Sequence, residues 1–210
     1  MTHPSSAILL TGFGPFPGVT DNPTAHIAAL LRDEIIADVS IHTEVLPVSF
    51  KRAPNQVSEL LASSMHILAT LHLGVATDSR FIRLERSAKN HIETSVGDID
   101  GYGLHQDRVQ MNRPPNEVVL STLDVDSIAE HLCASGFDAR PSDDAGAYVC
   151  NALYHHSLTH EDRPTLFMHV PPTGEQWSVL RLARATRLVL GWLVQSAPSR
   201  PTNPIQGAGQ

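Results

Sequence analysis

The chain has 210 residues, 41% of them hydrophobic and 18% charged, and a formal net charge of −7 with histidine neutral. This length suits one domain with a full core, and we expect that domain to span residues 1–196. The negative charge, without any run of Lys or Arg, argues against nucleic acid as a general partner. Only two cysteines are present, Cys133 and Cys150, which excludes a disulfide framework and fits a reducing compartment.

The two ends of the chain predict its location and a tail. Met1–Ser6 has no basic region, and the apolar run Ala7–Leu10 is too short for a signal sequence or a membrane span. We therefore expect a cytoplasmic protein with no membrane partner. Residues 197–210 are rich in Pro, Gly, Ser and Gln without apolar periodicity, which predicts a disordered tail.

Short apolar runs alternate with segments of helical periodicity along the chain. In chain order, we expect a strand at Ala7–Thr11, a helix from Pro23 to about Leu31, a strand at Ile41–Val48, a helix at Ala53–Ser64, a strand at Ile67–Leu73, an extended segment at Ser79–Glu93, a surface excursion at Thr94–Asn116, a short strand at Val118–Leu120, a helix at Asp126–Ala134, a helix at Cys150–His160, a strand at Thr165–Val170 and a helix at Trp177–Gln195. The alternation predicts an α/β fold, a three-layer α/β/α sandwich around a largely parallel, twisted central sheet.

Cys150 stands where nucleophilic chemistry is favoured. It follows a Gly-containing segment and begins a predicted helix, whose macrodipole favours the thiolate there. That helix would run to the far edge of the sheet, and the next strand, carrying His169, would return to the carboxyl edge where such sheets bind ligands. An imidazole beside the thiol would act as its base. Position alone leaves open that Cys150 is a small buried hydrophobe, which is how we interpret Cys133.

A third residue is needed to hold the tautomer of the histidine. Glu85 is the best candidate because its segment can also return to the carboxyl edge, although position alone does not select it from the 22 acidic residues. Phe13 and Phe16 lie three residues apart in a Gly/Pro loop after the first strand. They could flank a flat apolar ring, or they could simply plug the edge of the sheet.

Two weaker patterns predict no cofactor and no metal. The Gly12–Gly18 loop has the wrong spacing for a dinucleotide fingerprint, and its prolines remove backbone donors that a phosphate would need. His155, His156 and His160 have no Cys or carboxylate partner at metal-binding spacing, so we expect a solvated helix face there.

Four segments in a fixed order carry a family resemblance. They are Leu10–Gly18 with Asn22 and Pro23; Leu73–Ala76 followed by Glu85, Arg86 and Asn90; Gly146–Asn151; and His169–Pro171 with Gln176. Together they resemble the pyroglutamyl peptidase I (pyrrolidone-carboxylate peptidase) family of cysteine peptidases. The match at Gly146–Asn151 is the most specific.

The resemblance implies an enzyme that removes N-terminal pyroglutamate from peptides by acyl transfer, without cofactor or metal, and raises the expectation of a homo-oligomer. It implies that Cys150 is the nucleophile, His169 its base and Glu85 the residue that orients His169. The remaining implied roles are ring binding by Phe13 and Phe16, pocket lining by Tyr148, Val149 and Val96, anchoring of the loop by Asn22, and help from Arg86 to backbone N–H groups at the oxyanion.

One loop departs from the family pattern. In Val75–Ser79, Thr77 and Asp78 stand where the family has glycines, and Val48 stands where it often has a threonine. A homologue that binds pyroglutamyl-like ligands without catalysis, or with altered specificity, is therefore the alternative hypothesis.

Overall fold

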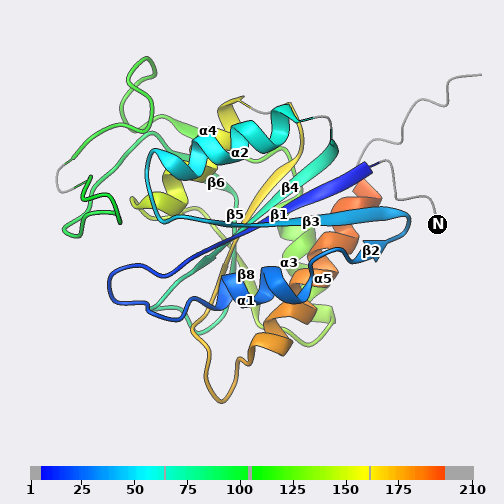
Figure 1. The fold of residues 1–210 in the computed structure, drawn as a ribbon. Helices are drawn as coiled ribbons and strands as arrows, with labels where there is room; N and C mark the ends of the chain where they lie inside the picture. Colours follow the sequence, from blue (N-terminus) through cyan, green and yellow to red (C-terminus); the bar gives the residue numbers. More distant parts are fainter. Residues whose placement is uncertain (1–5, 64, 104–105, 161, 197–210) are drawn as a thin grey trace, which may run out of the picture.

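The computed structural model describes residues 6–63, 65–103, 106–160 and 162–196. Four parallel strands form the centre of a seven-stranded sheet (Figure 1): β3 (Val39–Leu46), β1 (Ser6–Phe13), β4 (His66–Val75) and β9 (Thr165–Val170), side by side in that order. Their side chains are largely apolar and buried, as expected for strands covered on both faces.

The two edges of the sheet are antiparallel to its centre. β2 (Ile35–Ile36) pairs with β3, and β5 (Ile82–Glu85) pairs with β9, both antiparallel. β8 (Ala139–Ser142) then pairs with β5 in parallel. A separate two-stranded antiparallel sheet pairs β6 (Ser87–Lys89) with β7 (Val118–Leu120). The sheet is therefore mixed but largely parallel, as predicted.

Helices cover both faces of the sheet. α1 (Pro23–Leu30), α3 (Val125–Ala134) and α5 (Val179–Ser196) lie on one face, and α2 (Arg52–Ala62) and α4 (Val149–His160) lie on the other (Figure 1). Each face has its own hydrophobic cluster between sheet and helices. This arrangement confirms the expected three layers.

The first crossover shows how local sequence sets the architecture. Asn22 caps α1, because its Oδ1 accepts from the Thr24 backbone N–H at 3.1 Å, and Pro23 suits the first turn. Gly12 lets the start of α1 pack directly on β1: a Cβ there would lie 2.4 Å from the Thr24 carbonyl oxygen. The loop after β1 is thereby held against the end of the strand.

Most predicted elements are found within a few residues of their expected bounds. The extended segment at residues 79–93 forms β5 and β6, and β8 was missed because Arg140 and Pro141 interrupt any apolar pattern. The expected solvated histidine face is wrong for His155, which is fully buried. Residues 197–210 lie outside the described part of the chain. Among the residues described, no helix is both long and apolar enough to cross a bilayer.

Candidate active site

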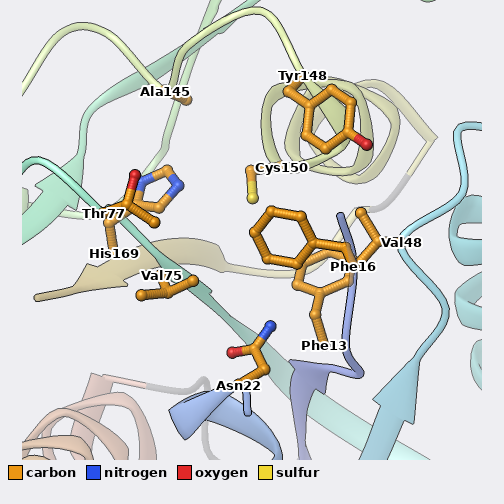
Figure 2. A pocket seen from close by; sticks show the side chains of 10 residues that line it. All are labelled: Phe13, Phe16, Asn22, Val48, Val75, Thr77, Ala145, Tyr148, Cys150 and His169. Carbon is orange, nitrogen blue, oxygen red and sulfur yellow. The ribbon is translucent and has the colours of Figure 1, made fainter. Parts of the chain in front are cut away.

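A cavity of about 210 Å³ lies at the carboxyl ends of the central strands. β3 and β4 follow β1 in sequence but lie on opposite sides of it, and open α/β sheets bind ligands at such switch points. The cavity is lined by strand ends and loops from distant parts of the chain (Figure 2): Phe13, Phe16, Asn22, Val48, Val75, Thr77, Ala145, Tyr148, Cys150 and His169.

Gly74 shows how close the thiol and the imidazole lie. It pairs with His169 across β4 and β9. A Cβ on Gly74 would be 2.9 Å from Cys150 Sγ and 2.9 Å from His169 Cδ2, so both side chains converge above a residue that has none. Figure 2 shows the imidazole on one side of the sulfur and the Phe16 ring on the other. The imidazole is therefore placed to accept the thiol proton.

A buried carboxylate fixes this imidazole. His169 Nδ1 donates to Glu85 Oε1 at 2.8 Å, and Glu85 is completely buried. In the antiparallel register, Arg83 lies opposite His169 and Glu85 opposite Phe167, which makes Glu85 a diagonal neighbour of His169 on the same face. With its hydrogen on Nδ1, the neutral ring has Nε2 free to take a proton.

Arg83 neutralises the buried carboxylate. Its Nε donates to Glu85 Oε1 at 3.1 Å, and its guanidinium also donates to the backbone carbonyl of Asp144. The Arg83 side chain is only 22% exposed. An unpaired charge in this position would be strongly destabilising. Arg83 therefore stabilises Glu85 and connects it to the segment that leads into α4 and Cys150.

The electrostatic environment of Cys150 is set mainly by burial. Burial raises the pKa of the thiol to about 12, and the charge of Glu85 acts in the same direction. A hydrogen bond from its own backbone N–H and the charge of Arg83 oppose the rise in pKa. The predicted effect of the helix terminus favours the thiolate but does not outweigh burial. Burial therefore favours the protonated thiol at rest.

The start of α4 is anchored by two side chains. Asn151 accepts from the backbone N–H of Lys89 at 2.8 Å and donates to the carbonyls of Lys89 and His91, both at 2.9 Å. Tyr154 donates to the backbone carbonyl of Glu85 at 2.9 Å. The first N–H groups of a helix have no partner within it, so the fixed end of α4 offers backbone donors beside Cys150.

Aromatic side chains form the other end of the cavity. Phe13 is buried at the end of β1, and Phe16 and Tyr148 are half-buried, with ring centroids 6.4 Å apart. Tyr148 donates its hydroxyl to the Gly97 carbonyl at 3.0 Å, so the apolar face of the ring remains toward the cavity. Asn22 Nδ2 donates to the Gly14 carbonyl at 3.0 Å and holds the loop that carries Phe16.

Three residues that the resemblance placed in the site do not line the cavity. Arg86 binds Asp126 Oδ2 at 3.0 Å and Asp143 Oδ2 at 3.1 Å and is not among the residues that line the cavity. Val96 is 48% exposed, and Val149 is buried in the hydrophobic cluster under α2 and α4. Side chains next to each other in sequence point in different directions, and motif matching does not resolve this.

Other residues of the site carry no strong signal in the sequence. Ala145 lines the cavity and Arg83 holds Glu85, yet neither stands out from composition or spacing. The unusual loop contributes Val75 and Thr77 to the wall, whereas Asp78 faces a neighbouring groove. Nowhere in the described chain do three His, Cys, Asp or Glu side chains gather as a metal site.

Comparison with known proteins gives a consistent assignment. The family model for pyroglutamyl peptidase matches residues 6–179. A pyrrolidone-carboxylate peptidase of Pyrococcus furiosus is 33% identical over 174 residues, covering 80% of this chain and 82% of that protein. Human pyroglutamyl-peptidase 1 is 26% identical over 193 residues, covering 90% of each protein.

Solved structures agree with the sequence relatives. A crystal structure of the pyrrolidone carboxyl peptidase from Pyrococcus furiosus has a TM-score of 0.84 at 27% identity and covers 90% of this chain and 99% of that one. The corresponding protein from Fervidobacterium islandicum has a TM-score of 0.80 at 30% identity, with the same coverage. The site, the sequence match and the fold agree, and the chain belongs to the pyroglutamyl peptidase family of cysteine peptidases.

Proposed function

We propose that this protein removes an N-terminal pyroglutamyl residue from peptides, with Cys150 as nucleophile, His169 as general acid and base, and Glu85 as the residue that orients His169. The observation that carries the proposal is the convergence of Cys150 and His169 over Gly74 at one end of a small aromatic cavity. The family's activity and the geometry of this chain support the same chemistry.

The reaction follows from the positions of these groups. His169 Nε2 takes the proton of Cys150 as Sγ bonds to the carbonyl carbon of the pyroglutamyl residue. Backbone N–H groups at the start of α4 stabilise the negative charge on the carbonyl oxygen. The C–N bond then breaks, and the leaving amine receives the proton from His169. Water, deprotonated by His169, attacks the thioester and releases free pyroglutamate and the thiol.

The cavity suits a single small, uncharged ring. Its volume of about 210 Å³ is below the ~300–1,000 Å³ typical of sites for drug-sized ligands. Phe13 and Phe16 offer flat apolar surfaces, and Val48 and Val75 extend them. Among the described residues, no Lys, Arg, Asp or Glu side chain lines the cavity. A pyroglutamyl ring is neutral, whereas an ordinary N-terminal glutamate would carry buried charges without partners.

The direct test is hydrolysis of pyroglutamyl-7-amido-4-methylcoumarin. We expect activity in the wild type and a loss of at least about 10³-fold in Cys150→Ser, because the nucleophile and its base act as a unit. Cys133→Ser is the matched control: Cys133 lies on α3, away from the cavity, and its loss should leave activity unchanged. Equal hydrolysis by the wild type and Cys150→Ser would contradict the assignment of the nucleophile.

We also propose that the protein acts in the cytoplasm. Both cysteines are free thiols, and a catalytic thiol persists where the redox state is reducing. A homo-oligomer, which the resemblance implied, remains our expectation for its assembly. Light scattering of the purified protein at several concentrations would test that expectation.

A further inference from the structure

We propose that a groove beyond His169 binds the part of the peptide that follows the scissile bond and favours a carboxylate on the third residue after that bond. We name it the arginine groove. It is lined by Asp78, Arg80, Phe81, Arg83, Asp138 and Arg140, together with Ser79 and Gln176. The inference rests on the proposed function, because it assigns the groove to the same substrate.

Strand pairing places the groove in line with the active site. Gly74 pairs with His169, His169 with Arg83, and Arg83 with Arg140, across β4, β9, β5 and β8. Paired residues on adjacent strands point to the same face of a sheet. Neighbouring strands are about 4.8 Å apart, so the backbone of Arg140 lies about 10 Å beyond that of His169.

The positions of the aromatic side chains and of His169 set the direction in which the peptide leaves the cavity. The Phe16 ring at the aromatic end of the cavity and the imidazole lie on opposite sides of the Cys150 sulfur (Figure 2). With the ring in the cavity, the leaving amine is on the side of His169, which donates its proton. The groove borders the cavity along the chain, since Thr77 lines the cavity and the next residue, Asp78, lines the groove. An extended peptide advances about 3.3 Å per residue, so its third residue reaches Arg140.

The charged side chains of the groove determine its preference for a carboxylate on the substrate. Arg83 is bound to Glu85, and Arg140 is bound to Asp138 at 3.1 Å with its guanidinium 4.0 Å from the centre of the Phe81 ring. Arg80 is exposed, and within the described residues it forms no ion pair. Arg80 lines the same groove as Arg140, which the third residue reaches, and it is therefore the cation available to a substrate there. Asp78 adjoins the cavity wall, so the preference for a carboxylate belongs to the outer part of the groove.

The experiment compares three peptides of the form pyroglutamyl-Ala-Ala-Xaa-Ala-amide, with Xaa as Glu, Gln or Lys. We expect the wild type to show kcat/KM in the order Glu, Gln, Lys, with Glu about five-fold above Gln, as for one exposed ion pair. Arg80→Gln should bring the Glu-to-Gln ratio to about one. Arg32→Gln is the matched control, because Arg32 is an exposed arginine just past α1 at the opposite edge of the sheet. Its Glu-to-Gln ratio should stay at the wild-type value. Raising the salt concentration should lower the wild-type ratio.

The outcomes separate this inference from the proposed function. If the wild type hydrolyses the coumarin substrate but cleaves the three peptides equally well, the groove assignment is wrong and the proposed function stands. A wild-type preference for Glu that Arg80→Gln retains would also overturn the assignment. Absence of hydrolysis of the coumarin substrate and of all three peptides would overturn both.

Discussion

Adding one methyl group at Gly74 should separate Cys150 from His169, the pair to which we assign the catalysis. The new Cβ would lie 2.9 Å from Cys150 Sγ, His169 Cδ2 and Phe167 Cε1, whereas ordinary contacts begin at 3.4 Å. Each of these groups must therefore retreat by at least 0.5 Å (3.4 − 2.9), or the strand must shift. A displacement of about 1 Å in a reacting group costs about 10²-fold in rate, so we expect kcat in Gly74→Ala to fall by about 10- to 100-fold.

Two measurements test this reasoning. The first is kcat on the coumarin substrate. The second is thermal unfolding, where overpacking should cost about 1–3 kcal/mol and lower the Tm by roughly 2–12 °C. Gly191→Ala is the matched control, because a Cβ there meets nothing within 4 Å. It lies inside α5, where alanine should raise the free energy of unfolding by about 0.5–1 kcal/mol and leave activity unchanged. A folded Gly74→Ala variant with kcat within about three-fold of the wild type would refute the argument.

Three further predictions concern the buried charges and thiols. Arg83→Gln should lower the free energy of unfolding by about 1–3 kcal/mol, less than for a fully buried pair, and should also lower kcat/KM, because Glu85 loses its cation. Arg83→Lys should recover part of the stability and part of kcat/KM. An unchanged denaturation midpoint in Arg83→Gln would contradict the role of Arg83. Alkylation of Cys150 by iodoacetamide should keep accelerating above about pH 8.5, because burial raises the pKa of its thiol. A plateau below pH 7 would show a preformed thiolate. Burial lowers the pKa of His72 to about 3, below its unfolded value of 6.5. The contribution of His72 to stability is therefore present above about pH 6.5 and is lost as the pH falls toward 3. Between pH 7 and pH 4 the Tm of His72→Gln should fall less than that of the wild type, and an equal fall would refute this role.

The layout of the protein was largely readable from local patterns. The apolar run of β1, the Asn-Pro start of α1 and the strand carrying His169 each have a local physical cause, and each is found where it was expected. The order of these elements also placed Cys150 and His169 at one edge of a largely parallel sheet. For the same reason the cavity could be anticipated at the ends of the strands.

Other features depend on pairings that no local pattern encodes. β5 runs antiparallel to β9, and this register alone brings Glu85 diagonally to His169 and sets Arg83 opposite it. The family resemblance implied a role for Arg86 at the oxyanion, but Arg86, three residues along from Arg83, binds Asp126 and Asp143. A shift of one residue in a strand reverses the face to which a side chain points, so sequence proximity did not determine which arginine serves the site.

The sequence by itself determined the family and the layered fold, because these depend on residue types and on short-range periodicity, and it predicted Cys150 and His169 as the reactive groups. Only the tertiary structure decided that Arg83 supports Glu85, that Val96 and Val149 lie outside the cavity, and that burial raises the pKa of the Cys150 thiol. The burial of a side chain and the compensation of its charge depend on neighbouring residues from many segments of the chain. The helix terminus that favours the Cys150 thiolate is visible in the sequence, whereas the desolvation that opposes it appears only when the chain is folded.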